Sequence, residues 1–329
     1  MADGAEATLD ADSKAFLAQV AAYGQKPEDV AVAQTRALTR QTMLAADRQA
    51  PEIGRVDAFD IPGRDGPVPV RVYYPSEKHD APLALVLFYH GGSWIYGDLD
   101  CFDNMMRSIC AGSGAAMLSV GYRLAPEHPF PAGLDDCHDA LLWAAGNAAP
   151  LGIDPSRIAV MGDSAGGNLA AAVTLRARDD GGPAIARQIL LYPVVDADGT
   201  EDRYPSRRDL GNGDHMISLA GIVWAFDLYL GKDGDRTSPL VAPIRAENLG
   251  GLPPAFILTA GFDPRRDEGR AYADRLKAAG VAVDYHCYAT TIHGFLSMPD
   301  WIKAAGQGRR QIAAWIADQL YREHRCLSP

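Results

Sequence analysis

Hydrophobic residues follow two patterns along the 329-residue chain, and each pattern predicts a different kind of β-strand. Period-two alternation over 55–61 and 68–74 predicts two short strands, and the Pro-Gly-Arg-Asp-Gly turn between them makes an antiparallel hairpin. Further along, uninterrupted apolar runs are typical of strands that are buried on both faces of a sheet. Six such runs follow, at 83–89, 115–122, 158–161, 189–192, 255–259 and 281–288.

Segments with helical periodicity separate these apolar runs. They lie at about 101–111, 133–147, 168–178, 265–279 and 301–323. Strands that alternate with helices predict a mainly parallel sheet with helices on both of its faces. Together with the hairpin, the pattern predicts an α/β fold whose eight-stranded, mostly parallel sheet has an antiparallel start.

The first fifty residues differ from this pattern, because they contain two helix-like runs and no strand. Ser13 is a candidate N-cap for the first run, which Gly24 would end, and Pro27 opens the second. We predict that this region is one part of a helical cap. The alternative is a helical extension packed on the back of the domain.

A second region, 196–235, interrupts the alternation after the sixth predicted strand. It is polar at first and helix-like over 216–230. An insertion of this length in a compact domain is more often functional than idle. We therefore predict a core formed by 51–195 and 236–329, and a cap formed by 1–50 and 196–235.

Composition excludes several classes of function. The formal net charge is −11, and the arginine pairs at 207–208 and 309–310 are isolated, so we expect solvated surface there and neither a nucleic-acid nor a membrane partner. No apolar run is long enough to cross a bilayer, and the acidic first residues do not resemble a secretory signal. The five scattered cysteines favour a reducing, cytoplasmic setting. Neither the cysteines nor the histidines have the spacing of metal ligands.

Candidate chemistry begins at Gly162-Asp163-Ser164-Ala165-Gly166, between an apolar run and an Ala-rich helical segment. Gly-x-Ser-x-Gly in this position is the nucleophile-elbow pattern, which forces the serine to the tip of a strained turn. Glycine is needed two residues to either side because a Cβ there would strike the adjacent backbone. The alternative is a Gly/Ser-rich turn without chemistry. Asp163 is expected to brace the turn, although the sequence does not identify its partner.

A serine nucleophile needs a base and an acid, which follow it in the order Asp/Glu, His in this architecture. Asp263 and His293 each come directly after a predicted strand, so both should reach the same sheet edge as Ser164. An N-cap role is the alternative for Asp263, and Asp267 and Glu268 are expected to be surface charges. The other histidines fit a base less well; they include His128, His215 and His286.

The third requirement is a set of donors for the oxyanion. Gly91 and Gly92 follow the strand at 83–89, and their N–H groups with that of Ala165 are the predicted oxyanion hole. The alternative is a flexible Gly-Gly turn, which would not explain its place after the third strand.

These residues lie in five motifs that resemble the hormone-sensitive-lipase-like esterases, which are bacterial carboxylesterases. The motifs begin at His90, Tyr122, Gly162, Asp263 and His293. The resemblance implies the α/β-hydrolase fold, a Ser164–Asp263–His293 triad, the oxyanion hole named above and a cap built from the two regions outside the alternation. It covers the chain from about residue 55 onward. One departure is Arg265, where the family usually has an apolar residue.

The sequence therefore predicts a cofactor-independent serine carboxylesterase that acts on short to medium acyl esters through an acyl-enzyme. An amidase or acyltransferase using the same triad is the first alternative, and a non-catalytic ligand-binding homologue is the second. The family often dimerises through the last strand, so we expect a homodimer through 281–288. Five residues could line the substrate pocket, although core packing is the alternative for each: Trp94, Tyr96, Met216, Trp224 and Phe226.

Overall fold

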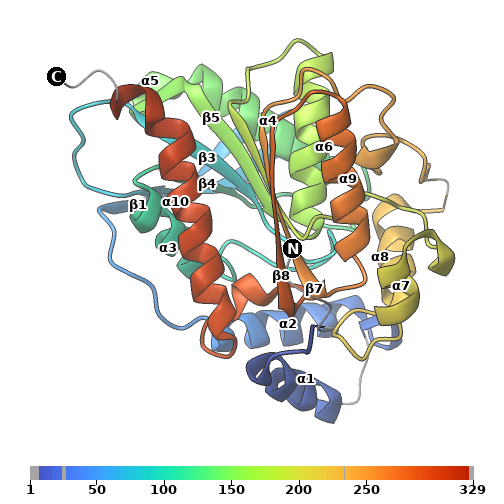
Figure 1. Cartoon of the computed structure of the whole chain (residues 1–329). Coiled ribbons are helices and arrows are strands. Elements are labelled where there is room, and N and C mark those ends of the chain that lie inside the picture. Colours follow the sequence, from blue (N-terminus) through green and yellow to red (C-terminus); the bar gives the residue numbers. More distant parts are fainter. Residues whose placement is uncertain (1–6, 24–26, 233, 326–329) are drawn as a thin grey trace.

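The computed structural model describes residues 7–23, 27–232 and 234–325, and its centre is one eight-stranded sheet (Figure 1). The strand order is β1-β2-β4-β3-β5-β6-β7-β8. Pairs β1–β2 and β2–β4 are antiparallel and all the others are parallel, which confirms the predicted fold class. The strands are β1 Arg55–Gly63, β2 Gly66–Tyr74, β3 Leu83–Tyr89, β4 Ala116–Val120, β5 Ile153–Asp163, β6 Arg187–Leu191, β7 Ala255–Phe262 and β8 Val283–Ile292.

Helices connect the strands within a few residues of the predicted positions. The α-helices are α1 Ala11–Tyr23, α2 Val32–Ala46, α3 Asp103–Ser113, α4 Ala132–Gly146, α5 Ala148–Leu151, α6 Ala165–Asp179, α7 Pro205–Leu210, α8 Leu219–Leu230, α9 Arg266–Ala278 and α10 Lys303–Arg325. Short 3-10 turns in the described ranges are η1 Pro27–Asp29, η2 Glu201–Arg203, η3 Pro243–Arg245 and η4 Phe295–Ser297. The expected cap at Ser13 is wrong, because Asp10 Oδ1 accepts the Ser13 N–H at 2.7 Å, and Gly24 lies outside the described residues.

Both faces of the sheet are covered, which explains the uninterrupted apolar runs. Along β3, Leu85 and Leu87 point into one hydrophobic cluster while Val86 and Phe88 point into the other. The first cluster includes buried residues of α4, α6 and α9, and the second includes buried residues of α3 and α10. In Figure 1, α3 and α10 accordingly run side by side on one face.

The helices of the two predicted cap segments gather at one end of the sheet. In Figure 1, α1, α2, α7 and α8 lie near the arrowheads of β7 and β8, which mark the carboxyl ends of these strands. The two segments touch each other, because the Ser218 hydroxyl donates to Glu28 Oε1 at 3.2 Å. Ligands of open α/β sheets bind at this end of the strands.

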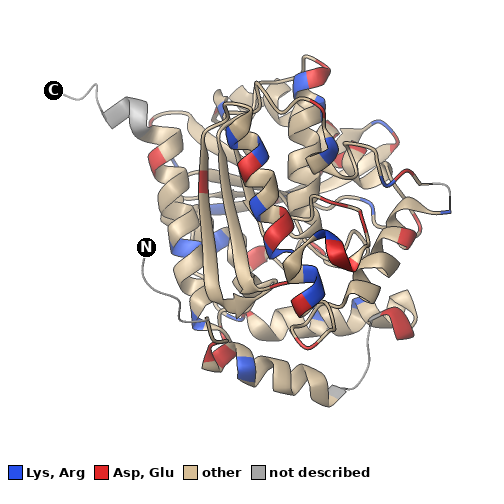
Figure 2. Ribbon diagram, turned by 45° about the vertical axis from the view of Figure 1, so that its right-hand side comes forward, with Lys and Arg blue, Asp and Glu red and all other residues tan. Residues whose placement is uncertain are grey.

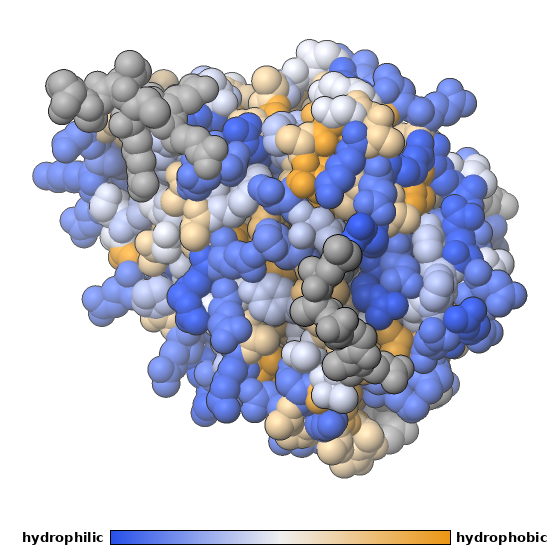
Figure 3. Space-filling view, in the orientation of Figure 1, coloured by the Kyte–Doolittle hydropathy of each residue, from blue (hydrophilic) through white to orange (hydrophobic). Residues whose placement is uncertain are grey.

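The surface is polar and carries both signs of charge. Basic and acidic residues are interspersed on the side seen in Figure 2, and hydrophilic residues cover most of the face in Figure 3. Among the described residues, no helix has the length and apolar character needed for a membrane crossing. One arginine of each pair is buried, so the expectation of solvated surface is wrong for Arg207 and Arg309. Arg207 is 0% exposed, and Arg309 is 5% exposed and forms an ion pair with Asp47 at 2.6 Å.

Candidate active site

Ser164 stands at a strained turn between β5 and α6. Its φ of 52° and ψ of −116° lie outside the regions that non-glycine residues favour. A Cβ on Gly162 would lie 2.1 Å from the carbonyl oxygen of Gly166, and one on Gly166 would lie 1.9 Å from that of Tyr89. The Ser164 N–H also donates to the Leu191 carbonyl at 2.8 Å. Close backbone packing therefore requires both glycines and holds the serine at the tip.

The structure brings the three predicted triad residues together. Asp263 directly follows β7 and His293 directly follows β8, so both reach the carboxyl edge where β5 delivers Ser164. His293 Nε2 lies 2.8 Å from Ser164 Oγ, and His293 Nδ1 lies 2.7 Å from Asp263 Oδ2. Since the carboxylate accepts the Nδ1 hydrogen, Nε2 is left free to accept the serine proton.

Asp263 has both carboxylate oxygens occupied and is completely buried. Oδ2 faces His293, while Oδ1 accepts the N–H of Arg265 at 2.7 Å, just before α9 begins. The alternative capping role is thus also present, because one carboxylate serves the turn and the histidine together. The Tyr192 ring, 4.8 Å from the imidazole between centroids, packs beside the histidine and restricts its orientation.

The glycine loop after β3 differs from the prediction at Gly91. The Gly91 N–H donates to Asp163 Oδ1 at 2.6 Å, so it is not free to bind an oxyanion. This bond contradicts the predicted role of Gly91 and identifies the missing partner of Asp163. Among the described residues, the N–H groups of Gly92, Ser93 and Ala165 have no acceptor. Ser93 is therefore a candidate donor that the motifs do not identify. The signal that could have indicated it is Asp163 beside the nucleophile, because its carboxylate takes the Gly91 N–H and leaves the next residues as donors.

Buried groups hold this loop in place. The His90 ring stacks on Tyr122 at 4.3 Å, and its Nδ1 donates to the Gly91 carbonyl at 2.8 Å. Burial lowers the pKa of His90 to about 4, so the ring is neutral at physiological pH. Burial also raises the pKa of Asp163 to about 7, against the opposing effect of the Gly91 N–H.

The five candidate pocket residues separate into different environments. Trp94 and Phe226 lie in the core, with their ring centroids 5.0 Å apart, as their alternative role required. Tyr96 lies beside the glycine loop, with its hydroxyl 3.2 Å from Ser93 Oγ. Met216 is 42% exposed and its Cε approaches Gly294, next to the catalytic histidine candidate. Trp224 lines a shallow hollow on α8, with Gly199, Leu219, Ala220, Val223 and Asp227.

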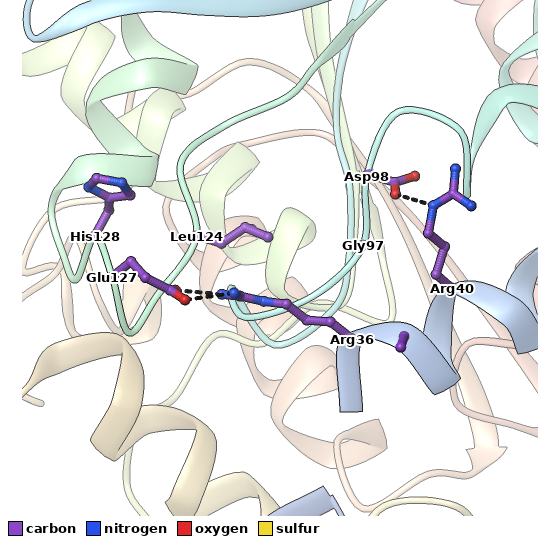
Figure 4. A pocket seen from close by; sticks show the side chains of 8 residues that line it. Arg36, Arg40, Gly97, Asp98, Leu124, Glu127 and His128 are labelled. Carbon is purple, nitrogen blue, oxygen red and sulfur yellow. Dashed lines mark hydrogen bonds and ion pairs between the residues drawn. The ribbon is translucent and has the colours of Figure 1, made fainter. Parts of the chain in front are cut away.

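A second hollow, of about 510 Å³, lies between α2 and the segments that follow the glycine loop (Figure 4). Arg36 crosses it to make two bonds with Glu127, at 2.6 and 2.7 Å, and donates to the Ile95 carbonyl at 2.7 Å. Arg40 pairs with Asp98 at 2.8 Å. Both guanidinium groups are therefore already neutralised, and their role is to tie α2 to the loop. The lining residues are Arg36, Ala37, Arg40, Gly97, Asp98, Leu124, Glu127 and His128.

Comparisons with known proteins agree with this geometry. The model of the alpha/beta hydrolase fold family matches residues 86–297. Carboxylesterase NlhH of Mycobacterium tuberculosis is 44% identical over 252 residues, covering 75% of this chain and 78% of that protein. Ethyl acetate hydrolase of Pseudomonas putida is 35% identical over 275 residues, covering 83% and 85%. The structure of an ester hydrolase from the metagenome of Lake Arreo, complexed with a derivative of bipyridine phosphonate, superposes with a TM-score of 0.89 at 35% identity, covering 94% and 98%. The chain therefore belongs to the α/β-hydrolase family and is a carboxylic ester hydrolase of the hormone-sensitive-lipase-like type.

Proposed function

We propose that Ser164 is the nucleophile of an acyl-enzyme mechanism on short to medium acyl esters. The observation that carries the proposal is the continuous pair of hydrogen bonds from Asp263 through His293 to Ser164. His293 takes the serine proton as Oγ attacks the acyl carbon, and the carbonyl oxygen becomes an oxyanion. The free N–H groups of Gly92, Ser93 and Ala165 then stabilise this negative charge.

Collapse of the first tetrahedral intermediate breaks the ester bond. His293 gives its proton to the departing alkoxide, so an alcohol leaves and the acyl group stays on Ser164. A water molecule then attacks the acyl carbon while His293 takes one of its protons, and that proton returns to Oγ as the carboxylic acid leaves. Asp263 remains ionised throughout and stabilises the imidazolium.

The preference for short to medium acyl chains rests on two supports. A relative named ethyl acetate hydrolase acts on a short ester. In this chain, Tyr96 and Met216 stand beside the site, where they would limit the room for an acyl or alcohol group. A series of p-nitrophenyl esters from acetate to laurate tests the preference, and we expect kcat/KM to peak at or below the medium chain lengths.

The same triad could form the acyl-enzyme from an amide, with an amine as the leaving group, or pass the acyl group to an alcohol in place of water. Amidase and acyltransferase activities therefore remain the alternatives. Adding a short alcohol to the ester assay and quantifying the transfer product against free acid separates transfer from hydrolysis. A matched anilide series measures amide cleavage. A non-catalytic binding role is disfavoured because His293 is present and bonded to Ser164.

Replacing the nucleophile tests the proposal. We expect Ser164→Ala to lower kcat by about 10⁴–10⁶-fold, as in serine hydrolases whose nucleophile is removed. Ser108→Ala on α3 makes the same atomic change far from the site and should keep the parental rate. Parental turnover by Ser164→Ala would overturn the assignment.

We also propose a homodimer that pairs β8 with its copy. β8 is the last strand in the order of the described sheet, so its outer edge can pair with another strand. Near the end of β8, the Thr290 carbonyl already accepts the Asp10 N–H at 2.8 Å. Cys287 is exposed near the middle of this strand, so antiparallel pairing about a two-fold axis there would bring two thiols together. Light scattering should give a dimer mass, and mild oxidation should cross-link the parent but not Cys287→Ser. A monomer mass at micromolar concentration would refute the dimer.

A cytoplasmic location is proposed from the free thiols of Cys101, Cys110, Cys137 and Cys287.

A further inference from the structure

Three charged residues are buried next to the turn that carries Asp263. Arg207 and Glu268 are 0% exposed, and Arg265 is 4% exposed. Arg207 belongs to α7 of the insertion, whereas Arg265 and Glu268 belong to the turn and first residues of α9. The surface roles expected for Arg207 and Glu268 are therefore wrong.

The Glu268 carboxylate joins three segments of the chain. It accepts the Val195 N–H at 3.0 Å, Arg265 Nη1 at 2.9 Å and Arg207 Nη2 at 2.6 Å. Arg207 also donates to the backbone carbonyls of the insertion at Asp196, at 3.2 Å, and at Asp198. Buried ionic groups that lose one partner leave an uncompensated charge, so such a network strongly favours one arrangement of its members.

The residue before Arg207 makes a second link to the same turn. Ser206 Oγ donates to the Pro264 carbonyl at 2.9 Å, and Ser206 N–H donates to Asp267 Oδ2 at 2.8 Å. Pro264 directly follows Asp263 in the chain. Two consecutive residues of α7 thus bind the turn, Arg207 through its guanidinium group and Ser206 through its hydroxyl and its backbone N–H.

A short series of hydrogen bonds links these contacts of α7 to Ser164. Arg265, held by Glu268, donates its backbone N–H to Asp263 Oδ1, and Asp263 Oδ2 faces the imidazole of His293. We propose that Arg207 is a positioning residue for Asp263, through which α7 of the cap holds the acid of the triad in place. The inference rests on the proposed function of the triad.

Arg207→Met tests it, because methionine keeps the apolar stem and removes the guanidinium. The matched control is Arg208→Met. The side chain of Arg208, the next residue, is 57% exposed, and within the part of the chain that the structure describes its ion pair is with Asp209. A phosphonate ester that labels active serines gives two readouts, the fraction of competent sites and the labelling rate constant of each competent site. A role confined to folding stability changes the first and leaves the second unchanged.

We expect Arg207→Met to lower kcat and the labelling rate constant on the order of tenfold, because small misplacements of catalytic groups have effects of this size or larger. KM should change by less than about twofold, since Arg207 does not face the acyl site. Arg208→Met should behave as the parent. Parental constants in folded Arg207→Met would overturn the inference.

A double-mutant cycle shows whether Arg207 acts through the acid. In an Asp263→Asn background, adding Arg207→Met should lower the labelling rate constant by less than about twofold, because the group it positions is already gone. An undiminished tenfold loss in that background would place the effect of Arg207 elsewhere and overturn the inference.

Ser206→Ala keeps the test decisive if Arg207→Met does not fold. It removes the hydroxyl that donates to the Pro264 carbonyl and accepts the Asp267 N–H, without changing any charge. We expect a two- to fivefold lower rate constant, again absent in the Asp263→Asn background. Parental kinetics of Ser206→Ala would then overturn the inference. A parent protein that neither hydrolyses esters nor labels would instead refute the proposed function, so the two failures are distinguishable.

Discussion

The nucleophile elbow and the turn over 263–265, called the acid turn below, hold Ser164 and Asp263 by different physical means. Ser164 is fixed by backbone packing, in which Gly162 and Gly166 admit neighbouring carbonyls to within about 2 Å of where a Cβ would stand. Asp263 is fixed by side chains, and its turn is gripped by Arg207 and Glu268, which are 61 residues apart in the chain. The two glycines that satisfy the steric constraint lie within five residues of each other, although one of the carbonyls they admit belongs to Tyr89. The ionic partners of the turn that carries Asp263 are far apart in the chain and form no motif. The elbow can therefore be recognised in the sequence as a motif, whereas the contacts that hold Asp263 in place cannot.

The largest expected effect is at the elbow. Gly166→Ala would place a methyl group 1.9 Å from the Tyr89 carbonyl oxygen, and neither backbone segment can move without disturbing the sheet. We expect the variant to lose at least about 4 kcal/mol of stability or to fail to fold. Urea denaturation measures the loss. Gly146→Ala, on α4 where nothing lies within 4 Å of the new methyl group, is the control and should be neutral or slightly stabilising.

The acid turn should be sensitive to charge instead of volume. Glu268→Gln keeps the size of the side chain but leaves Arg207 and Arg265 buried without their shared carboxylate. We expect a loss of about 3–5 kcal/mol in the free energy of unfolding, the usual cost of removing one member of a buried ion pair. A loss below about 1 kcal/mol would show that the turn is held by packing, as the elbow is.

A smaller and pH-dependent effect is expected where the elbow meets the glycine loop. Burial raises the pKa of Asp163 from 3.8 to about 7, so the folded protein keeps a proton there that the unfolded chain has already lost. The stability contributed by this protonated group is complete below pH 3.8 and is lost as the pH rises through 7. Asparagine does not titrate and can still accept the Gly91 N–H.

Asp163→Asn should therefore gain stability relative to the parent as the pH rises from 4 to 8, by on the order of 2–4 kcal/mol. Thermal melts of both proteins across this range measure the difference. A constant difference in stability over the whole range would contradict the raised pKa and its cause in burial.

Most of the fold could be predicted because its signals are local. The apolar runs of the parallel strands, such as 83–89, and the helical periodicity between them located each element to within a few residues. Chain order and strand ends were enough to bring Ser164, Asp263 and His293 to one edge. Each of these inferences needs only the residues beside it and the rules of parallel sheets.

The errors at the site share one cause, which is a contact between residues far apart in the chain. The sequence predicts Gly91 in the oxyanion hole because nothing in it shows that Asp163, 72 residues later, takes the Gly91 N–H. The sequence places Arg207 and Glu268 on the surface because nothing near either residue shows that the other, 61 positions away, is its buried partner. The prediction lacks Ser93 for a related reason. Because the Gly91 N–H is bonded to Asp163, the N–H groups without an acceptor among the described residues begin one residue later, at Gly92.

The most direct test of the account is the chemical fate of Ser164 during turnover. The enzyme is mixed with p-nitrophenyl butyrate, quenched in acid within the first turnover, digested and analysed by mass spectrometry. We predict that one butyryl group is found on the peptide containing Ser164, that it disappears as hydrolysis proceeds, and that Ser164→Ala carries none. Ester turnover without any acyl group on Ser164, or the same modification on another residue, would contradict the proposed mechanism.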